Sequence, residues 1–190
     1  MGERTAADHR LVLTVTTDEY RCESLAFSHD GHLLAIGKSN GMVGIWDLAA
    51  GAPIKHFLHD LCGDAVTAVA FSPDDRWLAT AGRDGHLKIR DMLSSKLVLR
   101  RQHPAAVRAV AFDAVAELIA TACDDGVLRL WTRRGRIQSQ IDGGCTAATR
   151  AITFVPAGGL ETSDRAPTSG GNGLFAVAGP TELKVFRSSG

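Results

Sequence analysis

The chain alternates apolar and polar residues over many short stretches. In Val107–Phe112 and Val127–Trp131, for example, the apolar side chains stand at every second position. A period of two puts such side chains on one face of a strand, whereas an amphipathic helix needs a period of about 3.6 residues. The pattern predicts an all-β protein built from short strands.

Similar turn dipeptides separate these stretches. Asn40-Gly41, Asp84-Gly85 and Asp125-Gly126 each stand between two apolar stretches, and Asp30-Gly31 stands one turn earlier. Because Asn, Asp and Gly accept a positive φ, these dipeptides favour two-residue hairpins. Each is expected to join two adjacent antiparallel strands.

Two sequence blocks recur along the chain in a fixed order. "LAIGKSNGMVGIWD", "LATAGRDGHLKIRD" and "IATACDDGVLRLWT" align without gaps, and each follows a block such as "VAFSPDDRWL". A fourth, divergent copy begins at "ITFVPAGGL". The repeat is marked by phenylalanines 41 to 44 residues apart: Phe27, Phe71, Phe112 and Phe154. A period of roughly 40–45 residues with four short strands is typical of a propeller blade.

Trp46-Asp47 is the dipeptide after which the WD-repeat family is named, and "AVAFSPDD" followed by "LATAGRDG" is similar to the family consensus. The chain resembles this WD40-type β-propeller family over about residues 11–187. The resemblance implies four repeats, each a four-stranded antiparallel blade, at about residues 22–60, 65–104, 106–144 and 148–187. We expect a polar tail at residues 1–10, a lone outer strand at Leu11–Thr14, and a flexible insertion rich in Gly, Ser, Thr and Pro at residues 157–173.

The resemblance also implies a hydrogen-bonded tetrad of His, Ser or Thr, Asp and Trp within a blade. The third copy has all four residues, at His103, Thr121, Asp125 and Trp131. The indole can only donate and needs the hydroxyl, the hydroxyl can bind the imidazole, and the imidazole can bind the carboxylate. This arrangement indicates a structural brace rather than a catalytic site.

The second copy departs from the tetrad. It keeps Thr80 and Asp84, but Arg90 stands at the Trp position. Its longer loop puts His59 three residues too early and leaves Cys62 at the His position. We expect this blade to be only partly braced.

The first and fourth copies also depart from it. The first keeps Trp46 but has Ile36 and Asn40 at the hydroxyl and Asp positions. The fourth has Cys145 and Phe186 in place of His and Trp. Only the third blade is therefore expected to be fully braced.

Strand order bears on how the blades are assembled. The chain runs through one outer strand, three complete cycles and three inner strands, and the last of these is Leu183–Phe186. Three arrangements stay open: a closed ring of four blades, half of a dimeric propeller, or a fragment of a larger propeller. An open arc would leave two apolar faces of about 500 Å² each uncovered. That exposure forfeits on the order of 12 kcal/mol per face, so a paired or fragmentary propeller is favoured.

Composition narrows the class of partner. The net charge is +0, from 21 Lys and Arg against 21 Asp and Glu, which disfavours nucleic acid and anionic membranes. No apolar run approaches the roughly 18 residues that a membrane span needs, and "MGERTAADHR" has no apolar core of a secretory signal. The four cysteines form no C-x-x-C pair, which indicates isolated reduced thiols. We expect a cytoplasmic protein, with a nuclear location as the alternative.

The resemblance implies a non-enzymatic protein–protein interaction scaffold that binds a peptide or protein through its propeller loops. Candidate partner-binding residues at the channel mouth are Glu23, Thr67, Arg108 and Arg150 at the start of each innermost strand, and Lys38, Arg83 and Asp124 in turns on the same face. Two Arg and one Glu around one mouth could bind an acidic peptide bidentately.

Alternative functions rest on less. The chain could be the sensor or substrate-receptor part of a larger signalling or ubiquitin-ligase assembly, and a homodimer or completion by another propeller segment stays open. A propeller enzyme or metal-binding propeller would need three or four converging Asp, Glu or His, so no catalytic, cofactor or metal residue is expected. Arg133, Arg134 and Arg136 lie in one turn opposite the mouth with no interleaved aromatic residue, which disfavours a nucleic-acid surface.

Overall fold

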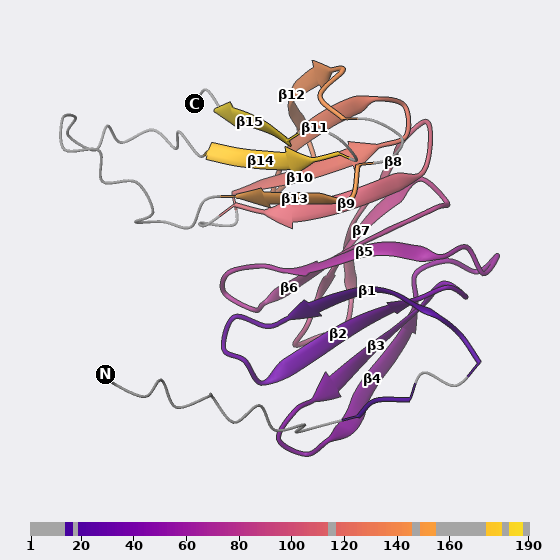
Figure 1. The fold of residues 1–190 in the computed structure, drawn as a ribbon. Coiled ribbons are helices and arrows are strands. Elements are labelled where there is room, and N and C mark those ends of the chain that lie inside the picture. Colours follow the sequence, from indigo (N-terminus) through magenta and orange to yellow (C-terminus); the bar gives the residue numbers. More distant parts are fainter. Residues whose placement is uncertain are drawn as a thin grey trace, which may run out of the picture.

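The computed structural model describes residues 14–16, 19–113, 117–145, 149–154, 174–179 and 183–187. These residues form fifteen strands in four antiparallel sheets, as Figure 1 shows. The strands are β1 (Cys22–Phe27), β2 (Leu33–Lys38), β3 (Met42–Asp47), β4 (Ala52–Leu58), β5 (Val66–Phe71), β6 (Trp77–Gly82), β7 (His86–Asp91), β8 (Leu97–Gln102), β9 (Val107–Phe112), β10 (Leu118–Cys123), β11 (Val127–Thr132), β12 (Ile137–Asp142), β13 (Ala151–Phe154), β14 (Leu174–Ala178) and β15 (Leu183–Arg187). The all-β prediction is confirmed.

Each sheet is a meander in chain order, as a propeller blade requires. Blades 1, 2 and 3 are β1 to β4, β5 to β8 and β9 to β12, and blade 4 is β13 to β15. Blade 4 thus has three strands among the described residues. Of the outer strand expected at Leu11–Thr14, only Thr14 is described, and it is not in a strand; the insertion at residues 157–173 also lies outside the described residues.

The turns between second and third strands are longer than expected. Three residues, for example 39–41 between β2 and β3, separate the strands, so the prediction of two-residue hairpins is wrong here. Only the glycine of each turn has a positive φ, at Gly41, Gly85 and Gly126. The preceding Asn or Asp instead accepts the N–H two residues on, as Asp84 does from His86 at 3.0 Å. This is the three-residue loop in which glycine alone takes the left-handed conformation.

Adjacent blades pack through two unlike faces. One face of a blade, here the forward face, presents alanines from the two inner strands and branched residues from the third, such as Ala79, Ala81 and Ile89 in blade 2. The opposite face, here the rear face, presents larger side chains, such as Val110 and Ile119 in blade 3. Each of the three apolar clusters joins a forward face to the rear face of the next blade. These interfaces are the core of the molecule.

The four blades form an open arc. The innermost strands β1, β5, β9 and β13 lie side by side in that order and together line a hollow of about 490 Å³. In Figure 1 the indigo sheet of blade 1 and the yellow strands of blade 4 stand at opposite ends of the row. A closed ring of four blades is therefore not the arrangement of this structure.

Candidate functional site

Blade 3 contains a hydrogen-bonded chain built on Thr121. The indole Nε1 of Trp131 donates to Thr121 Oγ1 at 2.8 Å, and His103 Nε2 lies 2.9 Å from the same oxygen. All three side chains are buried. Since the hydroxyl accepts from the indole, its own proton is available for the imidazole nitrogen.

Asp125 does not complete this chain. It receives hydrogen bonds from Arg129 at 3.1 and 2.6 Å, and the Nδ1 of His103 has no partner among the described residues. Burial, and then the charge of Arg129, lower the pKa of His103 to about 4. At neutral pH the imidazole is therefore uncharged, and it serves packing and hydrogen bonding.

Blade 2 has the histidine that sequence counting misplaced. His59 Nδ1 lies 2.7 Å from Thr80 Oγ1, and its Nε2 lies 3.2 Å from Asp84 Oδ1. The extra loop follows His59 rather than preceding it, because Asp60 Oδ2 accepts the N–H groups of Cys62 and Asp64 at 2.9 and 3.1 Å. Cys62 is exposed, so its placement at the His position was wrong.

The carboxylate of Asp84 is held ionised. Burial on its own would raise the pKa of Asp84, but the hydrogen bonds from His59 and the His86 N–H, with the charge of nearby Lys88, lower it further than burial raises it. Lys88 Nζ also donates to the carbonyl of His59. The brace of blade 2 thus joins the histidine, hydroxyl and carboxylate, but lacks an indole.

Arg90 takes the place of that indole. Its guanidinium carbon lies 4.6 Å from the centre of the Phe57 ring in β4, and its Nη2 donates to the carbonyl of Leu58 at 3.2 Å. A planar guanidinium stacks on an aromatic face much as a flat ring would. Arg90 therefore links blade 2 to the outer strand of blade 1.

In blades 1 and 4 apolar and sulfur groups replace the tetrad. Ile36 is buried at the hydroxyl position of blade 1, opposite Gly44 and two residues along the ladder from the Leu34–Trp46 pair. In blade 4, Cys145 Sγ donates to the carbonyl of Cys123 at 3.3 Å, and Phe186 stacks on Phe175 with ring centres 5.4 Å apart. We expected blade 3 to be the only fully braced blade. Instead, blades 2 and 3 each join three of the four tetrad residues by hydrogen bonds.

The predicted mouth residues gather at one end of the inner strands. The backbone N–H groups of Arg83 and Asp124 donate to the carbonyls of Ala65 and Ala106, which precede β5 and β9. Turns and strand starts therefore lie together. This is the end where the sequence placed the channel mouth.

Several of these side chains are already engaged with the protein itself. Arg108 Nε lies 2.8 and 2.9 Å from the two carboxylate oxygens of Asp124, so the two charges neutralise each other. Thr67 Oγ1 donates to the carbonyls of Ala81 and Val107, which ties blade 2 to blade 3. Lys38 is buried at the end of β2 rather than in the turn.

The other mouth residues are more open. Glu23 lies 3.8 Å from Arg21, and Arg83 and Arg150 are exposed. Among the described residues, the mouth thus holds the Arg108–Asp124 ion pair beside the more open Glu23, Arg83 and Arg150.

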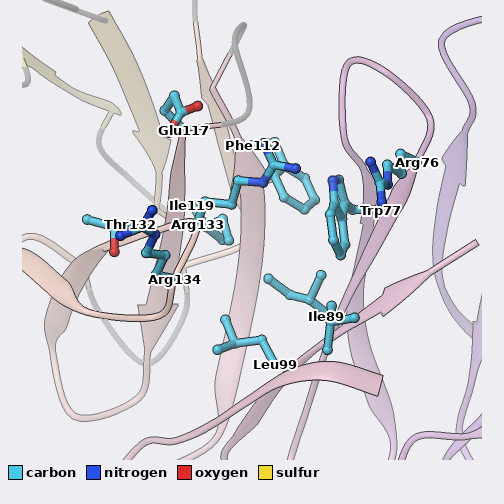
Figure 2. Close-up of a pocket in the computed structure, with 11 residues that line it drawn as sticks. Arg76, Trp77, Ile89, Leu99, Phe112, Glu117, Ile119, Thr132, Arg133 and Arg134 are labelled. Carbon is cyan, nitrogen blue, oxygen red and sulfur yellow. The ribbon is translucent and has the colours of Figure 1, made fainter. Parts of the chain in front are cut away.

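A pocket of about 600 Å³ lies at the opposite end, between blades 2 and 3 (Figure 2). Its apolar wall includes Ile89, Leu99, Phe112 and Ile119, and its rim carries Arg76, Glu117, Arg133 and Arg134. The strands supply the wall, and the β5–β6, β9–β10 and β11–β12 turns supply the rim.

Trp77 lines this pocket and lies between two arginines. Figure 2 shows its indole between Arg76 on one side and Arg133 on the other, and each guanidinium carbon lies 5.1 Å from the indole ring centre. Arg76 Nε also lies 3.3 Å from Asp91 Oδ2. The Nε1 of Trp77 is buried and has no hydrogen-bond partner among the described residues. The pocket therefore combines an apolar wall with the cations Arg133 and Arg134, while Arg76 is paired with Asp91 and Glu117 adds a carboxylate to the rim.

Two kinds of feature are absent from the described part of the chain. No group of three or more His, Cys, Asp or Glu side chains there is arranged to hold a metal ion. In the same residues, no helix has the length and apolar character that crossing a membrane needs.

Comparison with known families agrees with the blade geometry. The model "WD domain, G-beta repeat" matches residues 52–91 and 95–132. The model "Anaphase-promoting complex subunit 4 WD40 domain" matches residues 5–62. Together the two WD40 models match more than half of the chain. This chain belongs to the WD-repeat family.

Its WD-repeat relatives are much longer proteins. Jouberin of Rattus norvegicus is 27% identical over 138 residues, which are 68% of this chain and 13% of that protein. U3 small nucleolar RNA-associated protein 21 homolog of Schizosaccharomyces pombe is 31% identical over 116 residues, 60% of this chain and 13% of that protein. WD repeat-containing protein SL1-17 of Schistosoma mansoni is 43% identical over 75 residues, 40% of this chain and 24% of that protein. This WD-repeat chain thus spans between 13% and 24% of the length of these relatives.

The residues that sequence reasoning missed had signals in the WD repeat. His59 directly follows β4 as His103 directly follows β8, so counting from the preceding strand would have placed it. Trp77 stands where the other complete copies have Leu33 and Leu118, next to Arg76. The sequence therefore shows an aromatic residue next to a charged one at the edge of a blade. The contact between Trp77 and Arg133 follows only from the fold.

Proposed function

We propose that this WD-repeat chain is a non-enzymatic interaction module that binds an acidic segment of a partner protein in the pocket between blades 2 and 3. The observation that carries the proposal is the pairing of an apolar wall with the Arg76, Arg133 and Arg134 rim around Trp77. A carboxylate of the partner could bind the arginines of the rim while a neighbouring apolar side chain of the partner packs against Ile89 and Leu99.

The chemistry favours a peptide over a nucleic acid. No aromatic residue is interleaved with the basic turn in the sequence, but the fold brings Trp77 of blade 2 against Arg133. Both faces of the indole are nevertheless covered by guanidinium groups, so a base has no open aromatic face on which to stack. The pocket suits a short acidic and apolar segment.

The wider role is part of the same proposal. The far greater length of the relatives supports a part in a larger assembly, such as its sensor or substrate receptor. One relative is named for the nucleolus, which supports a nuclear as well as a cytoplasmic location.

The test is peptide selection from a random display library, followed by affinity measurement of the selected peptides with the full chain. We expect selected peptides to pair Asp or Glu with a large apolar residue. Arg133→Glu should weaken their binding at least tenfold, and Arg136→Glu, in the same turn but outside the pocket lining, should change it less than twofold.

Two further variants separate the pocket from the mouth. If Arg83→Glu at the mouth abolishes binding while Arg133→Glu does not, the mouth is the binding site and the pocket proposal fails. A single-stranded oligonucleotide that competes with the selected peptides at equal concentration would also overturn the choice of a peptide ligand.

A further inference from the structure

The two end blades leave uncovered the faces that the inner blades bury. On the rear face of blade 1, Leu25 and Phe27 are 60% and 65% exposed. On the forward face of blade 4, Leu183 and Val185 are 67% and 60% exposed. These four are among the largest exposed apolar side chains of the described residues.

The same ladder positions are closed in the other blades. The strand register places Leu25 and Phe27 of β1 at the positions of Val69 and Phe71 in β5, which are 7% and 4% exposed. It places Leu183 and Val185 of β15 at the positions of Leu128 and Leu130 in β11, which are 0% and 3% exposed. The exposure therefore reflects the lack of a neighbouring blade among the described residues and not an unusual residue type.

The two uncovered faces match each other. Ala176 and Ala178 of blade 4 stand at the ladder positions of Ala120 and Ala122 of blade 3. Those two alanines form the shallow surface of the cluster in which Phe154 of blade 4 is buried. Blade 4 thus carries the alanine face on which a residue such as Phe27 would pack.

We propose that a second copy of this chain docks head to tail, with the forward face of its blade 4 on the rear face of blade 1, and that the reciprocal contact closes a ring of two chains. Each chain carries one face of each kind. All three internal interfaces join a forward face to a rear face, so the docked contact repeats a geometry that the chain already uses. Interfaces of this unlike kind form rings when the rotation closes.

Charge supports the same pairing. Arg150 precedes β13, and Glu23 lies near the start of β1, at corresponding places of their blades. Adjacent inner strands lie side by side, so docking brings Arg150 of one copy to Glu23 of the other, whose present partner Arg21 is 84% exposed and 3.8 Å away. Opposite charges at the rim favour this register over a contact between two like faces.

The first measurement is the mass of the full chain in solution by light scattering, over a hundredfold range of concentration. We expect a particle of twice the 20.1 kDa chain mass. A monomer throughout the range would overturn the proposal, as would an open polymer, because neither contains a closed pair.

Three substitutions identify the contact. Phe27→Lys places a charge on the rear face of blade 1, and Val185→Lys places one on the forward face of blade 4. Both contacts of a pair use one face of each kind, so each variant alone should be a monomer. Leu93→Lys changes a still more exposed apolar residue, 86% exposed, in the turn between β7 and β8 and should leave the pair intact. All three positions are open to solvent in the single chain, so these changes leave the blades folded, which circular dichroism checks.

Mixing the variants tests head-to-tail docking directly. The Phe27→Lys chain retains a sound forward face and the Val185→Lys chain a sound rear face, so an equimolar mixture should recover a particle of two chains. If Val185→Lys alone still pairs, or if the mixture stays monomeric, the faces do not dock in this way. Peptide binding at the blade 2–3 pocket should be the same in both variants, so failure of this proposal and failure of the proposed function are distinguishable.

Discussion

At the scale of single residues, the braces show how one side chain changes the partners of its neighbours. Lys88 in blade 2 donates to the carbonyl of His59 and lies 3.5 Å from Asp84 Oδ2, so Asp84 Oδ1 still contacts the imidazole. Arg129, at the same position of blade 3, binds Asp125 with two hydrogen bonds and leaves His103 with an unsatisfied nitrogen. A lysine acts as a point charge, whereas the arginine fork matches a carboxylate.

The indole hydrogen bond of blade 3 should contribute measurably to stability. We expect Trp131→Ala to lower the free energy of unfolding by about 3–5 kcal/mol, through lost burial. Trp131→Phe keeps most of the packing but loses the bond to Thr121, so it should cost about 1–2 kcal/mol. Urea titration measures both. Trp46→Phe is the matched control, since Ile36 stands at the hydroxyl position there, and an equal loss in the two Phe variants would refute a role for the hydrogen bond.

Arg90→Trp should strengthen blade 2 by about 1 kcal/mol. The new indole N–H can donate to Thr80 Oγ1, which His59 already contacts. This buried hydrogen bond outweighs the lost contact with Phe57 and the lost exposed hydrogen bond to the Leu58 carbonyl. A double-mutant cycle with Thr80→Val, followed by urea titration, isolates the bond. If the gain persists without the hydroxyl, packing rather than the hydrogen bond is its source.

The low pKa of His103 links stability to pH. An unfolded histidine takes up its proton near pH 6.5, but the buried imidazole resists protonation until about pH 4. The unfolded state therefore binds more protons in this window, and stability should fall by up to about 3 kcal/mol as the pH drops from 6.5 to 4. Urea titrations at stepped pH measure this, and His103→Gln should remove most of the slope between these values.

At the scale of elements, the turn between β5 and β6 acts as a clamp on blade 1. Asp75 has a φ of 54°, and its carboxylate accepts the N–H groups of His29 and Asp30 at 2.7 and 2.9 Å. A residue other than glycine in this region stores strain of about 1 kcal/mol or more. The hydrogen bonds to the neighbouring blade compensate for that strain.

Two substitutions at Asp75 separate the strain from the clamp. Asp75→Ala keeps the strain and loses both hydrogen bonds, so it should cost about 2–3 kcal/mol. Asp75→Gly loses the bonds but also the strain, so it should cost about 1 kcal/mol less. Urea titration gives the difference, and amide exchange at His29 and Asp30 should accelerate in both variants. Unchanged exchange would mean that the clamp has no effect on the blade 1 turn.

The strands were more predictable than the turns that connect them. A period of two in Val107–Phe112 and Val127–Trp131 reflects burial on one face, which is a local property, and both segments are strands. The length of a turn depends on the twist of both flanking strands, so Asp84-Gly85 alone did not reveal the third loop residue. His59 was misplaced for a related reason, because the direction in which a loop bulges is set by bonds such as those to Asp60.

At the scale of the whole molecule, the repeat predicted the blades, but the binding surfaces depend on contacts between blades. Arg133 and Trp77 are far apart in the sequence and meet only because blade 3 packs on blade 2. At the predicted mouth a contact within one blade matters instead, because Arg108 in β9 pairs with Asp124 in the turn after β10. The position of a residue within a repeat thus predicts at which end of the inner strands it lies, but not whether its charge is already paired with another residue of the chain.

Pairing of two chains also predicts how the whole molecule melts. If the rear face of blade 1 and the forward face of blade 4 are covered only in the pair, the folded state gains stability with concentration by mass action. With an unfolding enthalpy of about 0.7 kcal/mol per residue, the Tm of a two-chain particle should rise by about 2 °C for each tenfold increase in concentration. Calorimetry over a hundredfold range measures this rise, and Phe27→Lys should melt lower and at the same temperature throughout. The contrary result is a Tm that stays constant over that range in both the full chain and the Leu93→Lys control. It would mean that folding and association are not coupled, and that each four-blade arc is stable with its end faces open.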